Sequence, residues 1–483
     1  MDLDRLDLIK TKKTMITIGF STRKSNPSYI EHIRKTVGFK NAEIIEVIND
    51  GEKSLTKVYN EILNQAKNDI VVLCHDDLIF ETKSWGNEIQ KNFKKSEYGI
   101  IGLAGSTYMP ESGVWWEKSM TMRGIVNHKN EEKSWQSKYS KDYGKIANVA
   151  LVDGLFIAID RNRIKHKFDE EFGGFHFYDL SFTTPNYLDG VKIGVTYDVR
   201  VTHLSVGVTT PSWEENKKLY VEKYKDKLPY TLDENCDITT FITCHDQDII
   251  KSNIASGKFD SLGKVVFMFV GNGEFTDIEN YDNVIIVRDL PDNIEKYPNF
   301  TAFTAWYAIM KNKLCNTKYI NLLEYDVNLK DNYGFFLKNM LKASDPKIVG
   351  YFPLQMSNYH YITNQDWVSS IFKGLLDAYN LDMKAYMNNL MNDAKSKNVE
   401  LYWPTTNNVC LLTSYFEKYM NWLEPIIPYM MGDQYAGHNQ ERALSFFSLL
   451  TNVPVYFYVG DVEHVQADSH KTQGHEVTKE VVL

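Results

Sequence analysis

The chain has 483 residues, of which 43% are hydrophobic, and a net charge of −9. At about 100–200 residues per domain, this length predicts two to four domains with packed cores. The acidic balance excludes a protein that binds nucleic acid through a broad basic face. No stretch approaches the roughly 18 apolar residues of a membrane-spanning helix, and the N-terminus lacks the apolar segment of a signal peptide.

Cysteine usage indicates a reducing compartment. There are five cysteines, an odd number, and no two are spaced as C-x-x-C. This pattern favours free thiols over disulfides or a zinc site. We therefore expect a soluble cytoplasmic protein. The basic run RNRIKHKF at residues 161–168 suits either a solvated face or contact with phosphate or anionic lipid, so any membrane contact is expected to be peripheral, at the inner face.

The first 80 residues alternate between strand and helix patterns. Buried strands are predicted at residues 14–20, 42–48 and 69–77, and helices at 29–37 and 54–67. Such alternation is typical of a parallel sheet covered by helices, and ligands in that architecture bind beyond the carboxyl ends of the strands. We therefore expect the polar residues at the three strand ends to converge on one crevice.

Those strand ends carry Ser21-Thr22-Arg23, Asn49-Asp50 and His75-Asp76-Asp77. Two adjacent carboxylates are costly to bury without partners, so at the rim of a sheet they indicate a function. Carboxylate oxygens are preferred ligands of Mg²⁺ and Mn²⁺, which are commonly held by one or two carboxylates and the phosphates of a substrate. A surface salt bridge or a helix cap is the alternative interpretation.

The rest of the first half continues the sheet. Strands are predicted within 99–105 and 149–161, Asp179 lies near a predicted helix start, and His203 follows a last strand. A polar segment at 213–236 reads as a helix followed by a linker.

A second strand–helix series begins at residue 237 and reaches KYINLLEYDVNL at 318–329, which again carries an acidic pair, Glu324 and Asp326. We expect an α/β protein of two similar tandem domains, residues 1–235 and 236–483. The sequence has no P-loop, no G-x-S-x-G and no H-E-x-x-H motif, and GNGEF at 271–275 lacks the helix of a dinucleotide fingerprint.

Six segments between residues 14 and 207 resemble GT-A glycosyltransferases of the family-2-like kind, in order and in spacing. They are TIGFSTR, SLTKVYNEILNQAKNDIVVLCHDDLIF, GIIGLAGSTYMPESGVWW, VDGLFIAIDR, FDEEFGGFHFYDLSF and VTHLSVG. The second half resembles a GT-A domain more weakly. The resemblance implies two tandem GT-A domains, which are Rossmann-like folds that use nucleotide-diphospho-sugars.

The resemblance implies roles for residues of the first half. Asp77 matches the metal ligand of the D-x-D element, whose first acid is replaced here by His75, and His203 matches the C-terminal metal ligand. Asp179 matches the catalytic base, and the pair Trp115-Trp116 lies where the family has an acceptor-side loop. Contacts to the nucleotide-sugar are implied for Ser21, Thr22, Arg23, Asp50, Asn60 and Asp76.

In the second half, the same reasoning implies Glu324 and Asp326 as metal ligands in D-x-D register. Glu441 opens a helical pattern where a base would lie. His470, with His464 as the alternative, matches the C-terminal metal ligand. A catalytically inactive, structural copy remains the other interpretation of this half.

The sequence thus predicts a bifunctional glycosyltransferase with Mn²⁺ or Mg²⁺ as cofactor. It would move sugars from UDP- or GDP-sugar donors to a growing surface glycan or glycolipid acceptor, with inversion in the first domain, and it could act as a homodimer.

One alternative is a single active N-terminal transferase whose C-terminal domain binds acceptor or serves as a scaffold. A sugar nucleotidyltransferase is disfavoured because GFSTRKSNP lacks a glycine-rich phosphate loop. A non-enzymatic carbohydrate-binding module would not need Asp77, Asp179 and His203 together.

Overall fold

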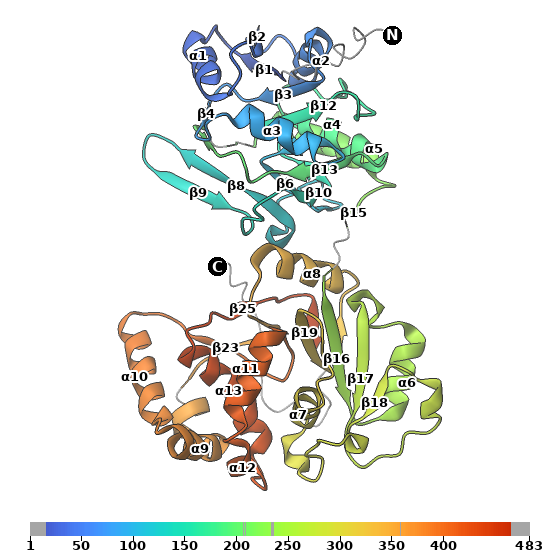
Figure 1. The fold of residues 1–483 in the computed structure, drawn as a ribbon, viewed down its shortest axis with the longest axis vertical. Helices are drawn as coiled ribbons and strands as arrows, with labels where there is room; N and C mark the ends of the chain where they lie inside the picture. The colour runs from blue at the N-terminus through green and yellow to red at the C-terminus, as the bar shows by residue number, and fades with distance from the viewer. Residues whose placement is uncertain (1–15, 206, 208, 233–235, 358, 465–483) are drawn as a thin grey trace, which may run out of the picture. The chain divides into compact units, whose positions relative to one another are not determined.

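The computed structural model describes residues 16–205, 207, 209–232, 236–357 and 359–464 (Figure 1). The chain divides into two compact units, Met1–Glu234 and Asn235–Leu483, called here the N-terminal and C-terminal units. The sequence placed this boundary between residues 235 and 236.

A seven-stranded sheet forms the centre of the N-terminal unit. In sheet order its strands are β10 (Ala147–Val149), β13 (Lys192–Val195), β5 (Tyr98–Gly102), β12 (Phe156–Asp160), β3 (Ile70–Cys74), β1 (Ile16–Thr22) and β2 (Glu43–Ile48). The first three strands of the chain, β1, β2 and β3, are parallel, as their alternation with helices predicts. The whole sheet is mixed, because β12 runs antiparallel to both β3 and β5.

The direction of β12 follows from where the chain enters it. Phe156, its first residue, pairs with Cys74, the last residue of β3. The backbone amide of His75 donates to the carbonyl of Leu155, 3.1 Å away. The loop Asp153–Leu155 therefore lies at the edge of the sheet where β3 ends.

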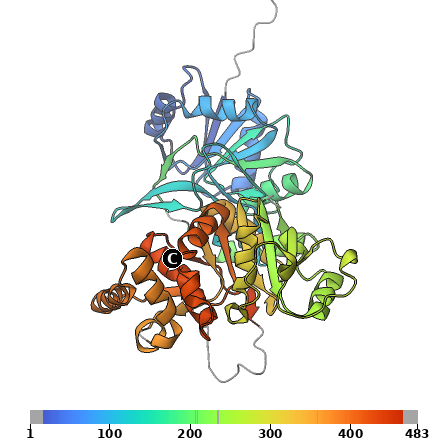
Figure 2. The same cartoon turned by 60° about the horizontal axis from the view of Figure 1, so that its bottom comes forward.

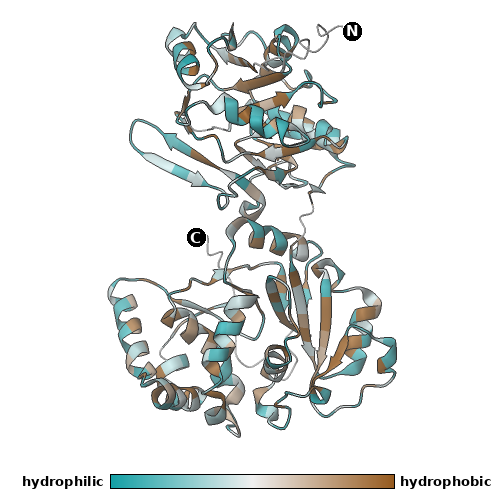
Figure 3. Cartoon of the chain, viewed as in Figure 1, coloured by the Kyte–Doolittle hydropathy of each residue, from teal (hydrophilic) through white to brown (hydrophobic). Residues whose placement is uncertain are grey.

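Helices cover both faces of this sheet. Helices α1 (Pro27–Thr36) and α3 (Trp85–Lys94) share one hydrophobic core with alternate residues of β3, namely Ile70, Val72 and Cys74. Helices α2 (Leu55–Gln65) and α4 (Tyr178–Leu188) share the other core with Val71 and Leu73. This two-residue alternation is the pattern of a strand buried on both faces, and Figure 3 shows the sheet strands as largely brown.

A second, smaller sheet carries the C-terminal histidine of the expected site. Its strands, in sheet order, are β11 (Leu151–Val152), β6 (Ala104–Ser106), β8 (Met122–Lys129), β14 (Val201–His203) and β4 (Leu78–Phe80). Strand β9 (Ser134–Lys138) pairs with β8 in a hairpin, and β7 (Tyr108–Met109) pairs with β15 (Tyr230–Thr231). His203 stands opposite Leu78 in the antiparallel β14–β4 pair, which brings it beside Asp77.

Helix α5 (Pro211–Tyr224) lies in the segment that the sequence predicts as a helix.

The arginines of the basic run at 161–168 bond within the N-terminal unit. Arg161 donates to the carbonyl of Leu63, and Arg163 donates to the carbonyls of Ser96 and Tyr98, at 2.8–3.0 Å. The two arginines of this run therefore make hydrogen bonds to backbone carbonyls of the N-terminal unit. None of the helices in the described part of the chain has the length and apolar character needed to cross a bilayer.

The strands of the C-terminal sheet are β18 (Val284–Ile286), β17 (Lys264–Phe269), β16 (Ile238–Cys244), β19 (Tyr319–Glu324), β24 (Val409–Leu412), β21 (Ile348–Gly350) and β25 (Tyr456–Phe457). Six of these seven strands repeat the order of the N-terminal sheet, and each sheet has one further edge strand, β18 here and β10 there. Strand β16 pairs in parallel with β17 and β19, and β24 runs antiparallel to β19 and β21, as β12 does to β3 and β5. Strand β20 (Val327–Leu329) pairs antiparallel with β26 (Val462–His464). Strands β22 (Pro353–Gln355) and β23 (Tyr402–Pro404) form a separate pair.

Eight helices are described in this unit, with short 3₁₀ turns between the elements. They are α6 (Gln247–Ser256), α7 (Phe303–Lys311), α8 (Tyr333–Ser344), α9 (Ser369–Tyr379), α10 (Met383–Ser396), α11 (Thr413–Leu423), α12 (Ile427–Met430) and α13 (Ala436–Leu450). Figures 1 and 2 both show α9 to α13, in orange to red, gathered on the opposite side of this unit from α6.

Candidate active site

A cavity of about 590 Å³ opens where β1, β2 and β3 end. Its lining residues are Ser21, Thr22, Arg23, Lys24, Ser25, Asn26, Asn49, Leu55, Tyr59, His75, Asp76, Asp77, Phe175 and Ser205. The strand ends therefore converge, as the parallel arrangement predicts. Four of the six expected nucleotide-sugar contacts, Ser21, Thr22, Arg23 and Asp76, line this cavity.

The other two expected contacts lie outside this lining. Asp50 is exposed, and its neighbour Asn49 lines the cavity instead. The Asn49 side chain donates to the carbonyl of Lys53 and accepts from the Lys53 amide, at 2.9 and 3.0 Å. Asn60 bonds to the amide and the carbonyl of Phe168, at 3.0 and 2.9 Å. Asn60 thus holds the segment that leads toward α4.

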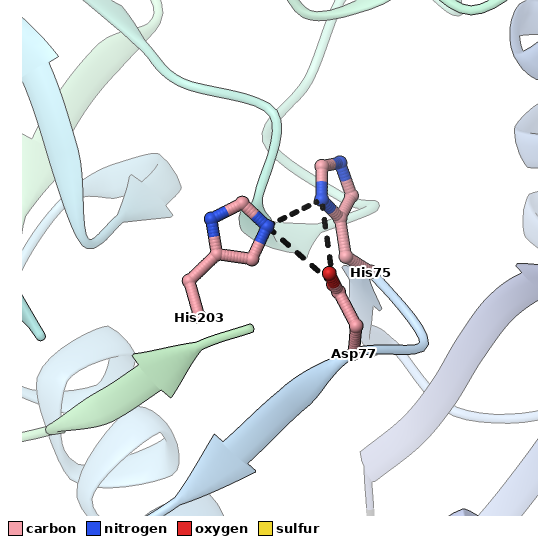
Figure 4. Close-up of side chains that lie close together, drawn as sticks. All are labelled: His75, Asp77 and His203. Carbon is pink, nitrogen blue, oxygen red and sulfur yellow. Dashed lines mark hydrogen bonds and ion pairs between the residues drawn. The ribbon is translucent and has the colours of Figure 1, made fainter. Parts of the chain in front are cut away.

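His75, Asp77 and His203 form a compact group, whose ligand atoms lie within 4.8 Å of one another (Figure 4). His75 Nδ1 is 3.3 Å from His203 Nε2 and 3.9 Å from Asp77 Oδ1. His203 Nε2 is 3.4 Å from Asp77 Oδ1. In the part of the chain that the structure describes, these three side chains lie close enough together to hold one metal ion.

The group fits a divalent cation. Three ligands bonded at about 2.0–2.2 Å with right-angled or tetrahedral geometry lie about 2.8–3.6 Å from one another, and two of the three separations fall within this range. Burial acts to raise the pKa of Asp77, but His203, Ser205 and His75 outweigh it and bring that pKa to about 2. Burial and the charge of His203 lower the pKa of His75. An ionised carboxylate and a neutral imidazole are the forms that bind metal.

Asp179 lies in the first turn of α4, close to Asp153. Burial, followed by the charge of Asp153, raises the pKa of Asp179 to about 7, against the opposing effect of the amides of Leu180, Asp179 and Gly154. A carboxyl group that titrates near neutral pH is suited to act as a general base.

Comparison with known proteins identifies the N-terminal unit. Residues 21–224 match the model of a family described as the glycosyltransferase-like family. The N-terminal unit is a glycosyltransferase-like domain. Its family comprises enzymes that transfer glycosyl groups.

Solved structures to which part of the chain is similar include the apo structure of the bifunctional glycosyltransferase WbbM. It is 14% identical, with a TM-score of 0.33, over 48% of this chain and 46% of that one. GalNAc-T7, solved with UDP, GalNAc and Mn²⁺, is 10% identical, with a TM-score of 0.32, over 44% of this chain and 48% of that one. The matched region thus spans about half the length of each of these structures. No curated protein shows significant similarity to the sequence.

Two functional candidates in the glycosyltransferase-like domain were missed from the sequence. Asp153 lies in the quoted VDG turn, and a polar residue directly after a strand is the signal that could have singled it out. Phe175 lines the cavity with an exposed ring in the loop that precedes α4. No sequence signal separates this phenylalanine from a core residue.

The tryptophan pair of the same domain divides into a core residue and a surface residue. Trp115 is 4% exposed and packs in a core cluster with Trp213 and Tyr220. Trp116 is 43% exposed, and its ring centroid lies 5.8 Å from that of Trp213. Only Trp116 therefore presents a ring to which a sugar could stack.

In the C-terminal unit, Glu324 ends β19 and accepts from the side-chain amides of Asn407 and Asn408, at 3.2 and 3.4 Å. Burial and the charge of Asp326 raise the pKa of Glu324 to about 7. Within the described part of the chain, Glu324 and Asp326 are not joined by a third metal-ligating side chain. His470 lies outside the described residues.

Glu441 lies in the second turn of α13, not at the helix start that the sequence pattern suggested. Its carboxylate accepts from the Thr405 hydroxyl and the Thr406 amide, at 2.9 and 2.5 Å. The same loop carries the two asparagines that bond to Glu324, and Glu441 adds to the rise of the Glu324 pKa. Glu441 and Glu324 therefore face a common region of the C-terminal unit.

Proposed function

We propose that the chain is a metal-dependent glycosyltransferase that moves sugars from nucleotide-diphospho-sugars to a growing surface glycan. One observation carries the proposal. The His75–Asp77–His203 group borders a cavity at the ends of β1, β2 and β3, and Tyr178 links His75 to the α4 turn that holds Asp179. A cation-binding group, a donor-sized cavity and a base candidate are thereby within one region of a glycosyltransferase-like domain.

Each part has a chemical task in the proposed reaction. The cavity, which includes Thr22 and Arg23, would bind the nucleotide. A divalent cation held by Asp77 and the two histidines would supply positive charge for the departing diphosphate. Asp179 would accept the proton of the acceptor hydroxyl. A single base with direct displacement leads to inversion, and Trp116 is the proposed surface for the acceptor sugar.

We further propose that the C-terminal unit holds a second transferase centre. Six of the seven strands of its sheet repeat the order of the N-terminal sheet. Val327, the residue after Asp326, stands opposite His464, just as Leu78, the residue after Asp77, stands opposite His203. Asp326 and His464 thus occupy the register positions of Asp77 and His203. Glu441 is the proposed base, and His464 or His470 the proposed third ligand.

The alternative is a C-terminal unit that binds acceptor or serves as a scaffold. One observation favours this alternative. Among the described side chains, no third metal-ligating group joins Glu324 and Asp326. Titration of a nucleoside diphosphate with Mn²⁺ against Asp77→Asn and against Asp77→Asn/Asp326→Asn tests this alternative. If the C-terminal unit is only a scaffold, Asp326→Asn leaves the remaining binding unchanged.

The experiment for the N-terminal centre is hydrolysis of candidate UDP- and GDP-sugars without acceptor, with and without Mn²⁺. We expect wild type to release sugar only with the cation, and Asp77→Asn to lose the activity that this centre contributes. The matched control is Glu88→Gln, a carboxylate on the surface of α3 that pairs with Lys91. Unchanged Mn²⁺-dependent hydrolysis of every donor in Asp77→Asn would contradict the assignment.

A further inference from the structure

We propose that His75 makes the N-terminal metal site selective for Mn²⁺ and other first-row transition ions over Mg²⁺, and that Tyr178 holds His75 in the orientation for binding. This inference rests on the metal site of the proposed function. It goes beyond that function by assigning a role to the histidine that replaces the first acid of the D-x-D element.

The donor set carries the first half of the inference. The His75–Asp77–His203 group offers two imidazole nitrogens and one carboxylate oxygen. Mg²⁺ prefers oxygen ligands in near-ideal octahedral geometry, whereas imidazole suits Fe, Ni, Cu and Zn. Mn²⁺ shares the oxygen preference of Mg²⁺ and has the lowest affinity of the first-row series for such sites, so among the transition ions it gains least from an imidazole. Two histidines and one carboxylate on one face are the ligands of Fe²⁺ in non-haem oxygenases. Replacing an oxygen donor by a nitrogen therefore costs Mg²⁺ more than a transition ion.

The orientation of the His75 ring carries the second half. Its Nδ1 faces His203 and Asp77, while its Nε2 lies 2.7 Å from the Tyr178 hydroxyl. If the Nε2 proton is donated to the Tyr178 oxygen, Nδ1 keeps its lone pair for the metal. A ligating histidine commonly has such a hydrogen-bond partner on its other nitrogen.

Tyr178 is itself fixed by packing. It is buried at the start of α4, and its ring meets that of Tyr59 edge to face at 5.5 Å. Gly154 leaves room for the hydroxyl, because a Cβ at that position would lie 2.1 Å from the Tyr178 oxygen. Tyr178 is thus a positioning residue, which acts on the metal through His75.

The C-terminal unit supplies the comparison within the same chain. Its motif has Glu324 where the N-terminal motif has His75, and Asp326 where the latter has Asp77. His75→Glu therefore gives the first motif the donor atoms of the second. The matched control is His128→Glu. His128 stands opposite His203 in the β14–β8 pair, with ring centroids 5.8 Å apart, but lies outside the metal-binding group.

The test measures Mn²⁺ and Mg²⁺ affinities of the full chain by calorimetry and by Mn²⁺ electron paramagnetic resonance, without donor or acceptor. Asp326→Asn is present throughout, so that the N-terminal site is observed alone. We expect His75→Glu to reduce the Mn²⁺-to-Mg²⁺ affinity ratio by about 10-fold or more. His128→Glu, which adds the same charge, should leave the ratio within about twofold. An unchanged ratio in His75→Glu, or an equal change in His128→Glu, would overturn the assignment.

Tyr178→Phe tests the positioning role. We expect a loss of Mn²⁺ affinity of about 10-fold, the usual effect of removing such a partner. In the His75→Glu background, the same substitution should have no further effect, since Tyr178 acts through the imidazole. Equal losses in both backgrounds would show a general structural role and overturn this half. Transferase assays are separate from these measurements, so the site can retain its selectivity even if the proposed reaction is wrong.

Discussion

Asp179 is subject to opposing electrostatic effects. A carboxylate in the first turn of a helix is stabilised by the helix dipole, whereas burial and Asp153 favour the protonated acid and raise its pKa to about 7. The folded-state pKa is thus above the unfolded value of about 3.9. Protonated Asp179 therefore contributes stability below that unfolded value, and this contribution is lost as the pH rises through about 7.

The activity of the N-terminal centre should have the opposite pH dependence. The base must be ionised, so we expect kcat/KM to rise with pH with a midpoint at or below about 7, because a bound cation further favours the anion. Asp153→Asn removes the second cause of the raised pKa and should move this rise to lower pH. The measurement is the pH profile of both proteins at fixed Mn²⁺. A rise that stays in place, or moves to higher pH, contradicts the proposed pairing of Asp153 with Asp179.

Removal of the proposed base should separate binding from turnover. Asp179→Asn keeps the shape of the side chain and removes its basicity, so we expect kcat to fall by about 10²–10⁴-fold. Donor affinity, measured by calorimetry, should remain close to that of wild type. Lost donor binding with an unchanged kcat would instead make Asp179 a donor contact.

At the scale of the elements, the proposed metal site depends on how α3 supports β4. Trp85 of α3 is completely buried, and its ring stacks on Phe80 of β4 with centroids 4.3 Å apart. Strand β4 follows Asp77 directly, and its Leu78 pairs with His203. The Trp85–Phe80 contact therefore fixes the position of two of the three proposed ligands.

Truncation of this contact should affect both stability and metal binding. We expect Trp85→Ala to lower the free energy of unfolding by about 3–5 kcal/mol, the usual cost of a large aromatic side chain in a core, and to weaken Mn²⁺ binding. The surface tryptophan Trp116 is the control, whose replacement by alanine should cost much less. Denaturant titration of both variants measures the difference, and equal costs would contradict the supporting role of α3.

For the whole molecule, the cores indicate two independently folding units. The core clusters described for the N-terminal unit draw on that unit alone, and the large cluster of the C-terminal unit runs from Phe241 to Phe447. We expect residues 1–234, produced alone, to unfold cooperatively and to bind Mn²⁺ as the full chain with Asp326→Asn does. Thermal unfolding and Mn²⁺ titration test this expectation. A fragment that is unfolded would show that the N-terminal unit needs its neighbour.

The two proposed centres should be separable by mutation. Asp77→Asn and Asp326→Asn should each remove a different glycosyl transfer. A carboxylate acts strongly only on a cation that it contacts, because the interaction between exposed charges is largely screened beyond a Debye length of about 8–10 Å. Candidate donors are supplied singly and together, and products are read by mass. If Asp326→Asn changes neither transfer and the C-terminal unit binds no nucleotide, the scaffold alternative replaces the second centre.

Local sequence patterns determined the elements around the N-terminal site. The unbroken apolar run from Ile70 to Cys74 already predicts a strand covered on both faces, since the side chains of a strand point alternately to its two sides. The polar residues at three successive strand ends predicted the crevice, because the carboxyl ends of parallel strands meet at one edge of the sheet. The resemblance in the motifs then pointed to Asp77, His203 and Asp179 as candidate site residues.

The tertiary structure decided which of these side chains meet. The proximity of Asp153 to Asp179, 26 residues apart, depends on β12 entering antiparallel beside β3, and nothing local in the sequence encodes that direction. Whether Trp115 or Trp116 is exposed depends on packing against Trp213, almost 100 residues away. The sequence offered His464 only as an alternative to His470, and the strand register then placed the His464 backbone at the position that corresponds to His203. Periodicity is set by neighbouring residues, whereas these contacts are set by the packing of elements distant in the chain, which a single sequence does not display.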